Sequence, residues 1–161
     1  MGVMPWSATR AAELIEQYRS QAGACLPILH ALQEEFGHVP AEAVPLVAEA
    51  LNLSRAEVHG VVSFYHDFRK TAPGRHVLKL CRAEACQAMG ADALAAKVKA
   101  RFGAGFGGTS ADGRLTLEPV FCLGNCACGP TAMLDERILG RADLAKIEFH
   151  LARRLAEERK S

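Results

Sequence analysis

The spacing of hydrophobic positions changes near residue 73 of this chain. Before that point apolar residues recur three or four positions apart, as they do on one face of an α-helix. Four such stripes are present: Leu14–Tyr18, Leu26–Phe36, one within Pro40–Leu51, and Val58–Tyr65. Because short helices gain most of their stability by burying these stripes against one another, the pattern predicts a small helical bundle over residues 1–72.

Residues that commonly start or stop helices divide this N-terminal segment. Gly37 is followed by Pro40, a combination that ends a helix through a left-handed cap. Asn52 closes the third predicted helix, and Pro45 either kinks that helix or sets its true start. Ser54-x-x-Glu57 is a capping box, which predicts that the fourth helix begins there.

After the Pro73-Gly74 turn signal the pattern becomes strand-like and predicts a second domain over residues 73–161. Helices are expected from Ala91 to Phe102 and from about Asp143. In the first domain, Tyr65 and Phe68 are assigned by default to the core. The expected strands are His76–Leu80, Leu115–Phe121, Thr131–Leu134 and Ile138–Gly140. The order β-α-β-β-β-α suits a small sheet flanked by helices, so the whole chain is predicted to be α+β.

Five of the six cysteines follow two of these predicted strands. Cys81 and Cys86 are spaced C-x4-C, and Cys122 and Cys126 are spaced C-x3-C, with Cys128 two positions further on. Two loops lying side by side can present four sulfur atoms to one inorganic centre. A [2Fe–2S] cluster is wider than a single ion, so these loose spacings on separate loops indicate an all-cysteine iron–sulfur site.

Two other interpretations of the cysteines remain open. Structural zinc also takes four thiolates, usually from tighter hairpins in small folds that depend on the metal. In that case the protein is a zinc-binding adaptor module. Disulfides are the second alternative, but six cysteines are few for a disulfide scaffold and no secretory signal is visible.

The motifs also resemble those of a known family. The C-x4-C and C-x3-C pairs with CLGNC, preceded by VVSFYHDFR, resemble the thioredoxin-like [2Fe–2S] subunit of complex I, which has relatives in soluble NAD-linked hydrogenases. CRAEACQAMGADAL, CLGNCACGP and YHDF resemble in particular the gamma subunit of soluble NAD-dependent formate dehydrogenases. The resemblance covers about residues 12–150. It implies a helical bundle followed by a thioredoxin-like α/β [2Fe–2S] domain.

The resemblance also implies which cysteines bind the cluster. It assigns Cys81, Cys86, Cys122 and Cys126 to the irons and leaves Cys128 as a nearby residue that does not bind. It places FMN and NAD on a partner subunit of the same complex, together with a molybdenum-type catalytic subunit. The chain is then an electron-transfer subunit that catalyses nothing alone, with equivalent subunits of a hydrogenase or of complex I as alternatives.

Other candidate residues carry weaker signals. Cys25 is interpreted as a small buried hydrophobe, and His59 and His66 as polar surface or interface residues, because a metal needs further ligands. The glycines of Gly103–Gly108 match G-x-G-x-x-G, but they follow a helix instead of a strand, so we interpret them as a loop. Arg82 is either a solvated side chain or, if it turns inward, a cation that raises the cluster potential from a typical value on the order of −400 mV.

Composition and charge exclude several function classes. The formal net charge of +1 gives no electrostatic case for binding nucleic acid or a membrane surface. No apolar run approaches the roughly 18 residues that a membrane span needs. The N-terminus MGVMPWSATR lacks the apolar segment of a signal peptide. These features predict a cytoplasmic protein whose thiols stay reduced.

Overall fold

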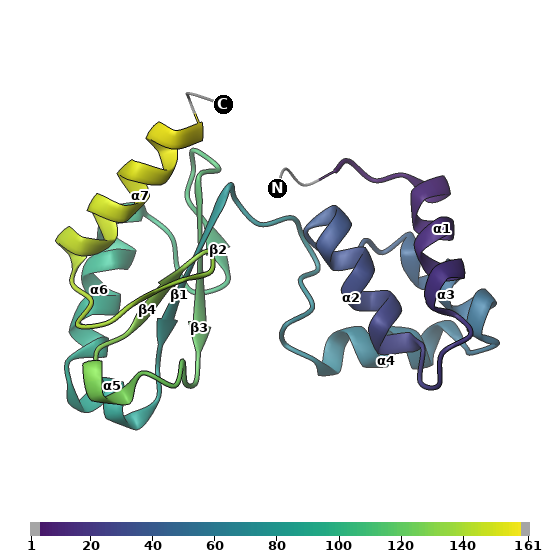
Figure 1. Cartoon of the computed structure of the whole chain (residues 1–161), viewed down its shortest axis with the longest axis horizontal. Coiled ribbons are helices and arrows are strands. Elements are labelled where there is room, and N and C mark those ends of the chain that lie inside the picture. Colours follow the sequence, from purple (N-terminus) through teal and green to yellow (C-terminus); the bar gives the residue numbers. More distant parts are fainter. Residues whose placement is uncertain (1–3, 159–161) are drawn as a thin grey trace. The chain divides into compact units, whose positions relative to one another are not determined.

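The computed structural model describes residues 4–158 and divides the chain into two compact units, with the boundary between Pro73 and Gly74 (Figure 1). Residues 1–3 and 159–161 lie outside the described part. Residues 1–3 belong to the N-terminal segment MGVMPWSATR, on which the prediction of a cytoplasmic protein partly rests. The helices are α1 Ala8–Tyr18, α2 Cys25–Phe36, α3 Ala43–Leu51, α4 Arg55–Phe64, α5 Glu84–Ala88, α6 Ala91–Phe102, α7 Leu144–Glu158 and the 3₁₀ turn η1 Cys126–Cys128. The strands are β1 His76–Cys81, β2 Gly108–Thr109, β3 Leu115–Val120, β4 Ala132–Leu134 and β5 Arg137–Leu139. Among these described helices none is both long and apolar enough to cross a membrane.

The helices of the first unit begin and end where the sequence signals stand. Gly37 ends α2 in the left-handed conformation with φ 73°, and Asn52 ends α3 with φ 53°. At the start of α4 the Ser54 hydroxyl accepts the Glu57 N–H, while the Glu57 carboxylate accepts the Ser54 N–H at 2.8 Å. The capping box is therefore formed, and bonding to Ser54 lowers the pKa of the Glu57 carboxyl.

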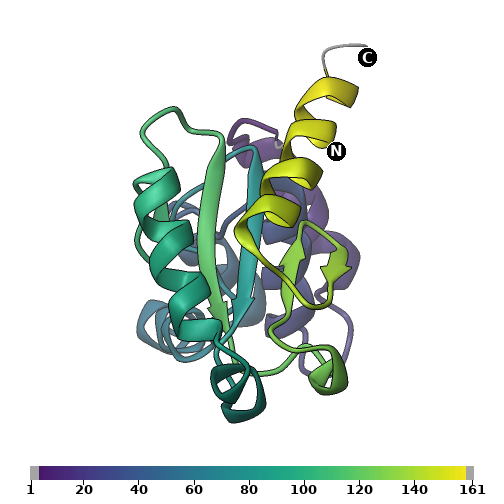
Figure 2. The same cartoon turned by 90° about the vertical axis from the view of Figure 1, so that its left-hand side faces the viewer.

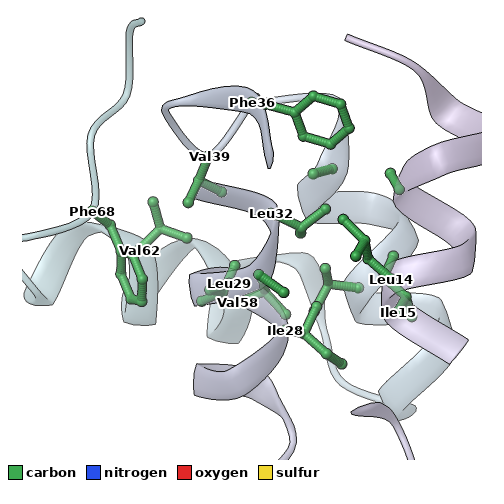
Figure 3. Packing of buried hydrophobic residues seen from close by; sticks show 14 of the residues in the cluster. Leu14, Ile15, Ile28, Leu29, Leu32, Phe36, Val39, Val58, Val62 and Phe68 are labelled. Carbon is green, nitrogen blue, oxygen red and sulfur yellow. The ribbon is translucent and has the colours of Figure 1, made fainter. Parts of the chain in front are cut away.

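The core of the first unit is built around α2 (Figure 3). Leu32 has no exposed surface and lies among side chains of α1 and α4, and Phe36 packs against the Trp6 ring with centroids 5.0 Å apart. Phe68 is buried, as expected. Tyr65 is not, because α4 ends at Phe64 and the Tyr65 side chain stays 43% exposed. The core assignment of Tyr65 was therefore wrong.

A mixed five-stranded sheet forms the second unit, in the order β2-β3-β1-β4-β5. The two central strands, β1 and β3, run parallel, and the other neighbouring pairs are antiparallel. Helices α6 and α7 lie on the same face of this sheet (Figures 1 and 2). Leu78 and Leu80 of β1 alternate with half-buried residues and pack with Val98 of α6 and Ile147 of α7, so the core lies between the sheet and these helices.

Two short elements of the second unit were missed from the sequence. Gly108–Thr109 pairs with β3, although Gly103–Gly108 was expected to be only a loop, and Glu84–Ala88 forms a separate one-turn helix. Neither segment is long enough to show a hydrophobic period, so only its contacts reveal it. The hairpin between β4 and β5 turns at Asp135-Glu136, where Asp135 adopts φ 54°, and β5 begins at Arg137, one residue before the predicted start at Ile138.

Truncating Leu32 tests the core of the first unit. We expect Leu32→Ala to lower the free energy of unfolding by about 2–5 kcal/mol, because it leaves a cavity among fully buried side chains. Leu53→Ala is the control, since Leu53 is 37% exposed and its loss should cost under about 1 kcal/mol. Chemical denaturation followed by circular dichroism measures both. Equal costs for the two variants would contradict this packing of α2.

Candidate metal centre

The parallel pairing of β1 and β3 brings the two cysteine pairs to one edge of the sheet. Cys81 is the last residue of β1 and lies opposite Val120, the last residue of β3. Since parallel strands end at the same edge, the chain after Val120 leaves the sheet next to Cys81. The Arg82 N–H donates to the Val120 carbonyl at 2.7 Å and extends this pairing beyond the strands.

Cys81 and Cys86 form the buried pair of the site. Cys81 is 2% exposed and Cys86 is 1% exposed, and both pack with Ala91 and Leu123. Cys86 lies in the middle of α5 and so precedes the longer helix α6, which begins at Ala91. The single turn of α5 follows the end of β1 closely, so the two thiols lie in one small buried cluster.

Cys122 and Cys126 form the exposed pair. Their sulfur atoms are 3.9 Å apart, and Cys126 begins the η1 turn. Gly124 lies between them with φ 72°, a left-handed conformation in which glycine is favoured. In this conformation the Gly124 N–H donates to the Cys122 sulfur at 3.3 Å.

Hydrogen bonds and charge connect the two pairs. Burial raises the pKa of the Cys81 thiol, and the Cys86 thiol raises it further, whereas the N–H groups of Ala83 and Leu123 donate to the Cys81 sulfur and oppose the rise. Leu123 belongs to the loop of the exposed pair, so its N–H joins that loop to Cys81. The pKa of Cys126 is raised chiefly by its contact with Cys122 and also by the charges of Cys86 and Cys81. Cys126 therefore lies within electrostatic reach of the other three thiols.

This donor set fits a cluster held by two pairs of thiolates. Two thiolates on one tetrahedral metal, with bonds of about 2.3 Å, place their sulfur atoms about 3.8 Å apart, and Cys122 and Cys126 are at 3.9 Å. Within residues 4–158 no group of three or more Cys, His, Asp or Glu side chains is placed to hold a single metal ion. N–H groups directed at Cys81 and Cys122 supply the bonds that stabilise thiolate sulfur in such centres.

The remaining candidate residues lie outside this group of four thiols. Cys25 starts α2 in the first unit and is half-buried at the edge of the core, where burial raises its pKa. His59 and His66 are exposed, as expected. Cys128 ends η1 and is half-buried, two residues beyond Cys126.

Arg82 is neither free in solvent nor a bare cation beside the thiols. Its guanidinium binds the Asp92 carboxylate at 2.8 Å and lies 5.3 Å from the centre of the Phe106 ring. Asp92 in the first turn of α6 is therefore the counter-ion of this guanidinium. Both sequence-based interpretations of Arg82 omitted this ion pair, because Asp92 lies ten positions further along the chain.

Sequence reasoning also missed the backbone donors of the site. The N–H groups of Ala83, Leu123 and Gly124 approach sulfur atoms whatever side chains these residues carry. Only Gly124 left a signal, since a glycine between two candidate ligands allows the backbone to turn around them.

Comparisons with known proteins agree with this geometry. Residues 11–153 match the model of the family described as thioredoxin-like [2Fe-2S] ferredoxin. A subunit of the NADH-quinone oxidoreductase of Pseudomonas aeruginosa is 34% identical over 122 residues, which cover 76% of this chain and 74% of that relative. The HndA subunit of the NADP-reducing hydrogenase of Solidesulfovibrio fructosivorans is 31% identical over 140 residues, covering 87% of this chain and 82% of that one.

A solved structure has a similar fold. A chain of the NAD⁺-reducing [NiFe]-hydrogenase in the air-oxidised state superposes with a TM-score of 0.69 and 27% identity. The match covers 88% of this chain but 24% of the hydrogenase chain, so it corresponds to about a quarter of that larger protein. These findings bear out the expected [2Fe–2S] fold, whereas none of them concerns a formate dehydrogenase.

Proposed function

This chain belongs to the thioredoxin-like [2Fe–2S] ferredoxin family, and from that premise we propose that it is the electron-transfer subunit of an NAD-linked oxidoreductase. The observation that carries the proposal is the meeting of two cysteine pairs at the shared edge of β1 and β3. Relatives named as subunits of an NADH-quinone oxidoreductase and of an NADP-reducing hydrogenase support the nicotinamide link.

We assign Cys81, Cys86, Cys122 and Cys126 as the four ligands of the cluster. When bound, a [2Fe–2S] cluster takes up and releases one electron at a time, at low potential when all four ligands are thiolates. The four side chains lose their protons to bind iron. The N–H groups of Ala83, Leu123 and Gly124 then donate to sulfur atoms that carry more negative charge, which stabilises the thiolates.

Exposure of the site suggests where electrons enter or leave. Cys122 and Cys126 are exposed, while Cys81 and Cys86 are buried. The neighbouring Phe121 side chain is 76% exposed, so a protein surface can approach closely on the side of the exposed pair. Burial of Cys81 and Cys86 keeps water from these two sulfur atoms, which lowers the local dielectric around them.

The partner we propose is a subunit that binds FMN and NAD. Nicotinamide exchanges two electrons as a hydride, so a one-electron centre works with a flavin that divides the pair. The G-x-G-x-x-G letters of Gly103–Gly108 follow α6 and lead into β2. A dinucleotide site instead follows a strand and opens a helix, which supports placing NAD on the partner.

Within this class, we propose the gamma subunit of a cytoplasmic NAD-dependent formate dehydrogenase, which also contains a molybdenum-type catalytic subunit. The support is the resemblance of CRAEACQAMGADAL, CLGNCACGP and YHDF to that subunit. The names of the relatives favour the second candidate, the equivalent subunit of a hydrogenase or of complex I.

The helical unit offers a surface for docking this flavoprotein. Phe64 ends α4 with 73% of its surface exposed, and its ring contacts that of Tyr65 at 5.1 Å in an edge-to-face arrangement. Aromatic side chains are enriched at the centres of protein interfaces. We therefore place the contact around Val61–Phe68.

Loss of one ligand should remove the cluster. We expect Cys86→Ala to reduce iron from about two atoms per chain to nearly none and to abolish the visible absorption bands, since a [2Fe–2S] centre takes four thiolates. Iron analysis and the absorption spectrum measure this. Cys25→Ala is the control and should retain both. Unchanged iron content in Cys86→Ala would contradict the ligand set, and bound zinc in place of iron would favour the zinc alternative.

Serine variants distinguish Cys126 from Cys128. Cys126 contacts Cys122, so we expect Cys126→Ser to lose or strongly alter the cluster while Cys128→Ser keeps its iron and spectrum. Electron paramagnetic resonance of the reduced proteins provides the comparison. The reverse result would make Cys128 the fourth ligand.

Purification with and without the flavoprotein tests the function. We expect NADH to reduce the cluster rapidly only when the flavoprotein is present, because the flavin divides the electron pair. Phe64→Ser should weaken the association, whereas Phe149→Ser, which changes an equally aromatic residue of the second unit with 59% exposure, should not. Rapid reduction by NADH alone would overturn the proposal. With the native complex, formate-driven NAD reduction identifies a formate dehydrogenase, and hydrogen-driven reduction a hydrogenase.

A further inference from the structure

A buried threonine connects the two cysteine pairs. Thr131 is 2% exposed, and its carbonyl accepts the Cys81 N–H at 3.0 Å. Its hydroxyl shares its single proton between the carbonyls of Asn125 at 3.2 Å and Cys128 at 3.4 Å. These two carbonyls lie on either side of Cys126. Thr131 therefore contacts the main chain at both halves of the site.

The turn after β5 supports the same loop from outside. The Arg141 N–H donates to the Cys128 carbonyl at 2.6 Å, and the Ala142 N–H donates to the Pro130 carbonyl at 2.7 Å. The Lys146 ammonium in α7 donates to the Gly140 carbonyl at 2.9 Å and holds the turn in place. Through these bonds the loop is fixed to the β5–α7 turn.

Gly140 is where the β5–α7 turn comes very close to the loop that contains Cys126. A Cβ atom at this position lies 2.7 Å from the Asn125 side-chain nitrogen and 2.9 Å from the Cys128 Cβ. The Asn125 amide can turn away, but the Cys128 Cβ moves only with its backbone. Any side chain at residue 140 therefore displaces either the turn or the loop that contains Cys126.

We propose that Thr131 is a positioning residue that sets the separation of the two cysteine pairs, and that Gly140 leaves the space this arrangement needs. The inference rests on the proposed function, because it concerns the cluster that the four thiols hold. Cys81 is fixed by strand β1, whereas Cys126 belongs to a 3₁₀ turn in a loop. The Thr131 main chain bonds Cys81, and the Thr131 hydroxyl bonds the turn that contains Cys126. Thr131 thus links the two cysteine pairs.

Loss of the hydroxyl affects the loop more than the fold. The Asn125 carbonyl also accepts the Cys128 N–H at 3.0 Å, and the Cys128 carbonyl keeps its bond from Arg141. Thr131→Val therefore leaves neither carbonyl without a donor. Because valine has nearly the shape of threonine, the substitution also leaves the packing almost unchanged. It removes the shared hydroxyl bond from Thr131 to the loop and leaves the loop freer to open.

The experiment compares Thr131→Val with Thr131→Ser, which keeps the hydroxyl. We expect an iron chelator to remove iron about five- to tenfold faster from the Val variant, the change that loss of ordinary hydrogen bonds produces. Thr131→Ser should stay within about twofold of the unchanged protein. The electron paramagnetic resonance spectrum and the reduction potential should shift in the Val variant alone, and thermal unfolding checks that both variants remain folded.

A second variant tests the space at Gly140 while the Thr131 side chain stays unchanged. Gly140→Ala should release iron faster and show a shifted spectrum. Gly105→Ala is its control, because a Cβ atom there meets nothing within 4 Å and its φ is not positive. If Thr131→Val does not fold, Gly140→Ala still decides whether the loop position controls the cluster.

The outcomes separate this inference from the proposed function. If the unchanged protein binds no [2Fe–2S] cluster, both are overturned. If it binds the cluster and Thr131→Val and Gly140→Ala both match it in release rate, spectrum and potential, only the positioning roles fail. If Thr131→Ser behaves like Thr131→Val, the hydroxyl is not the group that matters, and the assignment to Thr131 is overturned.

Discussion

The parallel pairing of β1 with β3 is the constraint on which the metal centre depends. Cys81 and Val120 lie opposite each other at the ends of these strands, so the loops that follow start at the same edge. A shift of one residue in this register would turn the side chain of Cys81 to the other face of the sheet. The buried leucines of β1 and β3 oppose such a shift, because it would expose them.

The two cysteine pairs differ in how the fold holds them. The buried pair is fixed by a strand and by one helical turn, and it packs within a small apolar cluster. The exposed pair lies in a loop whose Leu123 packs against the same apolar cluster and whose main chain is held by hydrogen bonds. Backbone N–H groups directed at sulfur stabilise the thiolate form, while burial opposes it at Cys81. Placing one pair near solvent limits the cost of gathering four negative sulfurs in one place.

The second unit supports the site from regions distant in sequence. Arg82 is bound by Asp92 and Phe106, so a cation beside a ligand is already paired within this chain. The β5–α7 turn holds the loop of the exposed pair from the other side. The second unit thus contains the four candidate cysteine ligands, while the helical unit has the exposed aromatic residues Phe64 and Tyr65.

Local sequence patterns determined the elements and the candidate ligands of this protein. The helix ends at Gly37, Asn52 and Ser54 follow from conformational preferences of single residues, and the cysteine spacings with the family resemblance predicted an iron–sulfur protein. Tertiary structure decided what depends on residues far apart in the chain. It paired β1 with β3 in parallel, placed the Leu123 N–H on Cys81, and set Thr131 between the two pairs. Such contacts leave no periodic signal, because strand pairing and loop packing join positions whose spacing in the sequence is arbitrary.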